Sequence, residues 1–195
     1  MKRLIMVGAA VIAVAASGFA FSDGDGRKFR EVLNGFKEAP QIVLTSGTGT
    51  FEASISRDGS EINYVLTFQN LESDARQAHI HLGWPQSNGS VVLWLCDSPG
   101  PPPQFPVSPV ESTPLCSQNS AAGDIKNGRV EGTLTAADLV PVAANGIAGP
   151  ADFDEVVAAI RAGRTYINVH TANIGAGEIR SQLSNGDEQG HQHDR

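Results

Sequence analysis

Most of the chain alternates between apolar and polar residues with a period of two, and this alternation limits the folds open to it. Residues 50–56 (TFEASIS) place Phe51, Ala53 and Ile55 on one face and polar side chains on the other. Because the side chains of a strand point alternately to its two faces, the pattern predicts half-buried β-strands. The same alternation recurs at 62–68, 128–135 and 165–171.

Turn sequences separate these segments and indicate antiparallel connections. The motifs RDGS (57–60), SNGS (87–90) and KNG (126–128) combine glycine with asparagine or aspartate, which favour tight turns. Between two of these turns, residues 90–95 (SVVLWL) are apolar on both faces, which is typical of a central strand. A last strand is predicted at 178–183 (EIRSQL).

One segment has a helical period instead. Within residues 150–163, Asp152 is a natural N-cap for a helix, and Gly163 can close its C-terminal end. Between them, apolar residues follow the i, i+3, i+4, i+7 spacing of one helix face: Phe153, Val156, Val157 and Ile160. Strands interrupted by one short helix predict an all-β domain, an antiparallel β-sandwich with one helical crossover.

The first twenty residues are typical of an export signal. Lys2 and Arg3 precede an uncharged apolar run at 4–20, and small Gly18 and Ala20 suit a cleavage site. The alternative is an uncleaved membrane anchor, but the run of 17 residues is short for a spanning helix of about 20. We therefore expect a periplasmic or secreted protein, with a signal peptide at 1–20, a linker at 21–28, one domain at 29–184 and a disordered tail at 185–195.

The charge of the chain excludes some partners. Loss of Lys2 and Arg3 with the signal would move the formal net charge from −7 to −9. Nucleic-acid binding needs a basic face, so this balance argues against nucleic acid, and equally against anionic membrane surfaces after signal removal.

Cys96 and Cys116 flank a proline-rich segment. In an exported chain an even cysteine count most simply forms a disulfide, which would stabilise the fold by roughly 3 kcal/mol on the loop-entropy model. The competing reading is a pair of thiolate ligands, although neither cysteine belongs to a CxxC-type pair.

Histidines are the main candidates for chemistry. His79 and His81 are two apart in an expected strand and therefore share a face, and the later strand places Tyr166, Asn168 and His170 on one face. If the two strands are neighbours, three imidazoles converge into a nitrogen site for Cu²⁺ or Zn²⁺. The alternative is structural, since strand histidines also hydrogen-bond to loop carbonyls.

The rest of the composition narrows the metal. Met1 and Met6 both lie in the signal, so a soft Cu(I) site is not expected, and imidazole with a carboxylate would suit Zn²⁺, Cu²⁺ or Ni²⁺. Glu178 is the weaker candidate ligand, with an ion pair to Arg180 as its alternative role. His191 and His193 in the tail could scavenge or deliver metal, although a solvated tail explains them better.

Several motifs together resemble the CHRD-domain family, named for its occurrence in chordin. The matching motifs follow one another in the sequence as INYVLTFQNLE (62–72), AHIHLG (78–83), NGSVVLWLC (88–96) and GTLTAADL (132–139). The last of them is YINVHTANIGAGEIRSQL (166–183). The resemblance covers about residues 29–184 and implies an immunoglobulin-like β-sandwich, with no settled biochemical activity. The proline-rich loop and Ser181, where the family more often has glycine, depart from its pattern.

A second resemblance concerns the site. The layout around AHIHLG is similar to the strand of copper-zinc superoxide dismutase that supplies two copper ligands. Carried over, it implies metal ligation by His79 and His81, with Arg180 near an anion-accepting opening. No counterpart of the dismutase zinc loop is visible, so we expect a single metal at His79, His81 and His170, with Asn168 and Arg180 around the ligands.

The favoured hypothesis is therefore an exported protein that binds one transition metal, copper before zinc, with another exported protein or a metal-delivery protein as partner. The alternative is a metal-free interaction module that uses residues 98–114 with exposed Trp84 and Phe105. No nucleophile elbow, P-loop or dinucleotide fingerprint appears, so metal-dependent redox chemistry is the one enzymatic class left open.

Overall fold

The computed structural model describes residues 27–98, 105–121 and 124–184. The expected signal peptide and the histidine-containing tail lie outside these residues and stay predictions. The strands are β1 (Lys28–Asn34), β2 (Thr48–Ile55), β3 (Glu61–Gln69), β4 (Ala75–Leu82), β5 (Val91–Asp97), β6 (Gly128–Thr135), β7 (Thr165–Thr171) and β8 (Ile179–Gln182). The expected strands are thus all present.

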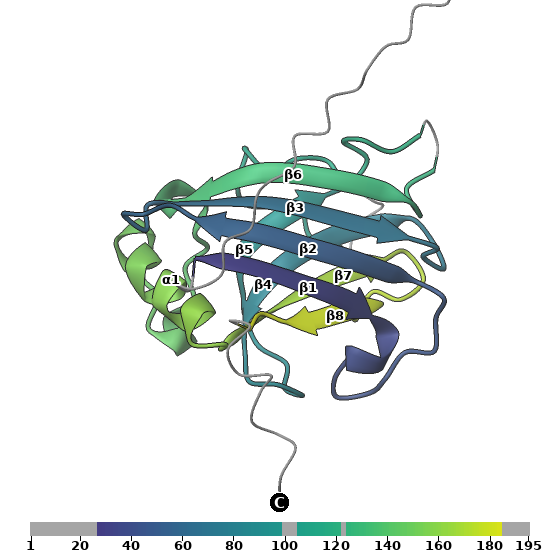
Figure 1. The fold of residues 1–195 in the computed structure, drawn as a ribbon, viewed down its shortest axis with the longest axis horizontal. Coiled ribbons are helices and arrows are strands. Elements are labelled where there is room, and N and C mark those ends of the chain that lie inside the picture. Colours follow the sequence, from purple (N-terminus) through teal and green to yellow (C-terminus); the bar gives the residue numbers. More distant parts are fainter. Residues whose placement is uncertain (1–26, 99–104, 122–123, 185–195) are drawn as a thin grey trace, which may run out of the picture.

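The eight strands form one antiparallel sheet in the order β5-β4-β7-β8-β1-β2-β3-β6, which curls into a nearly closed barrel. Figure 1 shows β1, β2, β3 and β6 as one layer, with β4, β5, β7 and β8 behind it. The two layers are joined where β1 pairs with β8 at Asn34 and Arg180. The predicted all-β antiparallel fold is confirmed, with the two layers continuous along one side.

The hydrophobic core lies between the two layers. Phe51 and Leu66 of the front layer and Ile80 and Ile167 of the back layer are fully buried in it. Burying each such side chain stabilises the fold by roughly 1.5–3 kcal/mol relative to leaving it in water. Because side chains alternate, the neighbours of Ile80 and Ile167 point to the outer face of the back layer.

Strand β1 was not predicted, and its burial pattern explains why. Phe29 and Leu33 are buried, but the position between them is the buried Glu31, while Val32 is 54 % exposed. A carboxylate on the inward face and a valine on the outward face conceal the alternation. Glu31 is satisfied by hydrogen bonds from the Ser181 hydroxyl and from the backbone and side chain of Ser184.

Strand β5 was predicted to be central, and this is wrong, since it ends the sheet. It is nevertheless buried on both faces. The segment 105–118 covers its free edge: Asp97 bridges Leu115, and the Asp97 amide donates to the Pro114 carbonyl. An edge covered by a loop of the same chain has the same apolar composition as a central strand.

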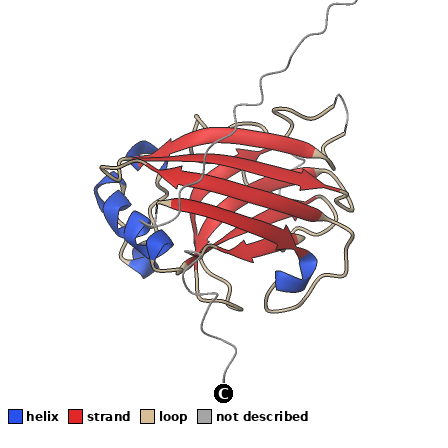
Figure 2. Ribbon diagram, viewed as in Figure 1, coloured by secondary structure: helices blue, strands red, loops and turns tan. Residues whose placement is uncertain are grey.

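The predicted helix is present as α1 (Phe153–Arg161), preceded by a 3-10 turn at Pro150–Asp152. Figure 2 shows the helices gathered mainly at one end of the sheet. Gly163 closes the segment with φ 67°, as expected. The Asp152 carboxylate does not cap α1; it accepts from the Ala148 and Gly149 amides instead. Among the residues described, no helix is long and apolar enough to cross a bilayer.

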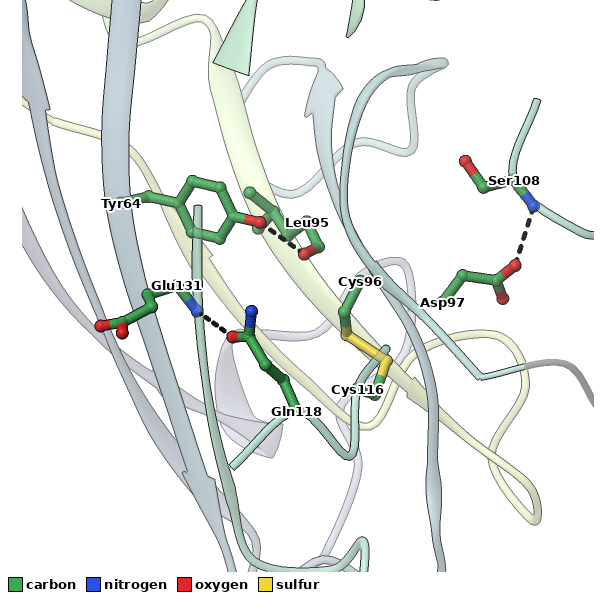
Figure 3. Close-up of a disulfide and its surroundings, with 8 residues drawn as sticks. All are labelled: Tyr64, Leu95, Cys96, Asp97, Ser108, Cys116, Gln118 and Glu131. Atoms are coloured by element: carbon green, nitrogen blue, oxygen red, sulfur yellow. Dashed lines mark hydrogen bonds between the residues drawn. A yellow bond between two sulfur atoms is a disulfide. The ribbon is translucent and has the colours of Figure 1, made fainter. Parts of the chain in front are cut away.

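The disulfide between Cys96 and Cys116 is confirmed, with the two Cα atoms 4.9 Å apart. Both cysteines are fully buried in the core. Figure 3 shows the bond between β5 and the segment that covers it, with the Ser108 amide donating to the Asp97 carboxylate nearby. The alternative of thiolate metal ligands is therefore excluded by the pairing.

Removing this bond should destabilise the protein without changing its fold. With both Cys96 and Cys116 replaced by alanine, we expect the free energy of unfolding to fall by about 3 kcal/mol, because the unfolded chain regains loop entropy. Urea denaturation followed by fluorescence measures the difference. An unchanged midpoint would contradict the expectation.

Candidate metal centre

Pairing of β4 with β7 brings the three strand histidines together. The strands are antiparallel neighbours, with His79 opposite Asn168 and His81 opposite Tyr166, and His170 opposite Gln77. The pairing of the two strands shifts register between Ala75 and Gln77, next to the position where Gln77 pairs with His170. The shared-face prediction for His79, His81 and His170 is confirmed, and the face is the outer one of the back layer.

The three imidazoles form a compact, buried group. Ring centroids lie 5.4 Å apart for His79 and His81, 4.9 Å for His79 and His170, and 5.9 Å for His81 and His170. One ring nitrogen from each histidine can be chosen so that all three lie within 4.8 Å of one another. The residues are 3 %, 7 % and 9 % exposed, so solvent hardly reaches the rings.

Two of the rings are oriented by backbone carbonyls. His81 Nδ1 lies 3.0 Å from the Gly89 oxygen, and His170 Nδ1 lies 3.0 Å from the Gly175 oxygen. A carbonyl only accepts, so each Nδ1 donates its hydrogen and leaves a lone pair on Nε2. Neither Nε2 has a hydrogen-bond partner, and the same is true of both His79 nitrogens. Metal-binding histidines typically donate their other nitrogen in this way.

Aromatic side chains enclose the group. Trp94 of β5 meets the His79 ring edge-to-face at 4.2 Å, and Tyr166 of β7 stacks on the His81 ring at 4.6 Å and 7°. The Tyr166 hydroxyl accepts from the Gly89 amide, and the Gly89 carbonyl accepts from His81, so Gly89 holds both stacked rings. These contacts restrict the rotamers of two candidate ligands.

Burial determines the protonation of the metal-free histidines. It lowers the pKa of His81 to about 4, against the hydrogen bond to Gly89, with smaller contributions from His170 and Arg180. Burial also lowers the pKa of His79, to which His170 and His81 add, and that of His170. At neutral pH the three rings are therefore neutral, the form that binds metal.

Asn168 and Arg180 lie beside the histidines on the same sheet, as expected. Asn168 is the cross-strand neighbour of both His79 and Arg180. The Arg180 guanidinium lies 3.4 Å from the centre of the Tyr166 ring, and its Nη2 donates to the Ser87 carbonyl.

Glu38 belongs to the same buried environment but was not found from the sequence. The Asn168 side-chain amide donates to its carboxylate, and burial raises the pKa of Glu38 to about 7 despite the nearby Arg180. Glu38 follows the 3-10 turn at Gly35–Lys37, outside any periodic segment. No local signal in the sequence could have related it to the strand histidines.

Glu178 occupies a different position from the three histidines. One carboxylate oxygen accepts from the Thr45 hydroxyl and the Glu72 amide, and the other accepts from the Thr171 hydroxyl. Thr171 follows His170, so its side chain points to the other face of β7. These hydrogen bonds use Glu178 to hold two loops against β7, and metal ligation by it stays an untested prediction.

The surface expected for an interaction module is only partly present. Phe105 is buried against Gly175, so its predicted exposure is wrong. Trp84 is exposed as predicted and lies under the Arg164 guanidinium. Residues 99–104 of the proline-rich loop lie outside the described part of the chain.

The buried histidines make the metal-free protein sensitive to acid. As pH falls below 6.5, the unfolded chain binds protons on histidine that the native state does not bind until about pH 4. Stability is thus fully present above pH 6.5 and is lost toward pH 4. For His81 alone the loss between pH 7 and pH 5 is about 2 kcal/mol. Urea denaturation of metal-free wild type and His81→Gln at both pH values measures it; equal losses in the two proteins would contradict it.

A comparison with known protein families identifies the family of the chain. The family model of the CHRD domain matches residues 29–183, which span β1 to β8 and include all three histidines. No curated protein matches the chain. No solved structure matches it. The match covers most of the sequence, and the chain therefore belongs to the CHRD-domain family.

Proposed function

We propose that this protein is an exported metal-binding protein that holds one transition-metal ion, copper before zinc, through the Nε2 atoms of His81 and His170 and one nitrogen of His79. The observation that carries the proposal is the group of three neutral, buried imidazoles whose ligand atoms lie within 4.8 Å of one another. Buried polar atoms in proteins nearly always have a partner, and a metal ion would be a common partner for all three.

A bound ion would also draw the rings inward. Copper and zinc bind imidazole nitrogen at about 2.0–2.1 Å, so two ligands of one ion are at most about 4.2 Å apart. Small rotations of the side chains close the present separations of up to 4.8 Å. His79 has no hydrogen bond to restrain such a rotation, whereas His81 and His170 are already oriented by carbonyls.

Export and delivery complete the proposal. The disulfide is compatible with an oxidising compartment, and the charged and apolar start of the sequence is typical of a signal peptide. A periplasmic or secreted protein with one buried metal would receive or pass on its ion through another exported protein. Redox chemistry at the metal would need an open coordination position beside the three imidazoles.

Metal binding should depend on each of the three histidines. We expect wild type to bind one copper or zinc ion per chain, and His81→Gln or His170→Gln to lower the affinity by about 100-fold, since a lost outer partner alone costs about 10–100-fold. All three proteins carry His191→Gln and His193→Gln, so that the tail contributes nothing. Competition with a chromophoric chelator and metal analysis after dialysis give affinity and stoichiometry.

Glu178→Gln is the informative comparison in the same experiment. It removes the carboxylate charge but leaves oxygen and nitrogen in its place, so the loops it holds keep most of their hydrogen bonds. Loss of affinity in this variant would place Glu178 among the ligands. Equal binding by wild type and by the histidine variants would refute the metal site altogether.

The alternative is a metal-free interaction module that uses the proline-rich loop. Val107 and Leu115 lie within the loop closed by the Cys96–Cys116 disulfide and are exposed and apolar, which favours the alternative. Deleting residues 99–113 should then abolish capture of an exported partner while metal binding persists. The reverse result, in which the deletion abolishes metal binding and leaves capture of the partner unchanged, would favour the metal-binding function.

A further inference from the structure

We propose that the three-histidine centre holds copper as the monovalent ion, and that Arg180, through its stack on Tyr166 and His81, makes a divalent ion unfavourable there. The inference rests on the proposed function, which it makes specific by naming the ion. The ligand inventory had argued against Cu(I), because the chain beyond residue 20 has no methionine and both cysteines are bonded to each other. The charge of the bound ion and the number of its ligands, which a count of ligand types does not consider, favour Cu(I).

The charge of the ion is not balanced by its ligands. All three are neutral imidazoles, and the group contains no carboxylate. The rings are at most 9 % exposed, so the ion would lie away from bulk water. The cost of placing an ion in such a medium grows with the square of its charge, so a monovalent ion costs about a quarter as much as a divalent one.

Arg180 adds a fixed positive charge on the same face. It is 2 % exposed, and solvent therefore screens it weakly. Its guanidinium covers one face of Tyr166 at 3.4 Å, while the His81 ring stacks on Tyr166 at 4.6 Å. The buried Glu38 carboxylate lies near Arg180, whereas Glu178 accepts from Thr171, whose side chain points to the other face of β7. Arg180 contributes to the lowered pKa of His81, after the larger effect of burial and that of His170.

The segment Ser87–Gly89 fixes this stack at three points. The Ser87 carbonyl accepts from Arg180, the Gly89 amide donates to the Tyr166 hydroxyl, and the Gly89 carbonyl accepts from His81. Gly89 cannot be replaced easily, because a Cβ there would overlap the Leu82 carbonyl. The hydrogen bond to Ser87 and the contact with Tyr166 hold the guanidinium at this position.

The number of ligands points the same way. The described residues supply three nitrogens, whereas zinc held by three histidines takes a water or substrate as its fourth ligand and Cu²⁺ prefers a tetragonal arrangement. Trp94 and Tyr166 lie against two of the rings, which restricts the space for a further ligand. Cu(I) is stable with two or three nitrogen ligands and has no such requirement.

Affinities for Cu(I), Cu²⁺ and Zn²⁺ test the proposal in the full chain with His191→Gln and His193→Gln. Cu(I) is measured by competition with bicinchoninate under ascorbate, and the divalent ions by competition with a chelator of known affinity. We expect Cu(I) to bind most tightly of the three. Arg180→Gln should lower the ratio of Cu(I) to Cu²⁺ affinity by about tenfold, since one nearby charge is removed.

Two further variants separate charge from fold. Arg180→Lys keeps the charge and should keep most of the ratio, and Arg129→Gln removes an exposed arginine on β6 and should leave it unchanged. Tighter binding of Cu²⁺ or Zn²⁺ than of Cu(I), or the same ratio in Arg180→Gln, would overturn the inference while leaving the metal site intact. If Arg180→Gln fails to fold, the wild-type order of affinities decides. If wild type binds no metal, the proposed function fails with it.

Discussion

The antiparallel pairing of β4 with β7 is the interaction on which the rest of the structure depends. Its register sets His79 opposite Asn168 and His81 opposite Tyr166, and thereby places the imidazoles and their aromatic and polar neighbours on one outer face. The opposite face of the same two strands supplies Ile80, Ile167 and Val169 to the core. A shift by one residue would exchange these faces and bury the histidines between the layers. Core packing and site assembly are thus two consequences of one register.

Loops give the outer face of the back layer its buried character. Two of them contact the histidine group directly, through the Gly89 and Gly175 carbonyls. A third reaches it from the other end of the chain, where Glu38 accepts from Asn168. The fully buried Glu178 holds parts of this cover in place by accepting from Thr45, Glu72 and Thr171. The outer face of the sheet thereby becomes a second, polar and aromatic interior beside the hydrophobic core.

The fold could be predicted well wherever side chains follow the local geometry of a strand. Residues 128–135 and 165–171 were predicted with the observed bounds, because both segments have the period-two alternation of a strand, although β7 is buried on both faces. Strand β1 was not predicted, since Glu31 is buried through hydrogen bonds from Ser181 and Ser184, which lie 150 and 153 positions away in the sequence. The edge position of β5 was also hidden, because the disulfide-bonded segment buries it as fully as a neighbouring strand would. In both cases a contact distant in sequence decided the burial.

The sequence by itself determined the strands other than β1, the helix, the disulfide partners and the sharing of faces by His79 with His81 and by Asn168 with His170. These properties follow from spacing along one chain segment, because strand geometry has a fixed period. Only the tertiary structure decided that the two segments are neighbours, that the rings are buried and neutral, and that Glu38 and Arg180 lie among them. Convergence of three side chains from β4 and β7 depends on strand order, and protonation depends on desolvation by distant loops. Neither the convergence of the side chains nor the protonation of the rings can be predicted from a local pattern of residues.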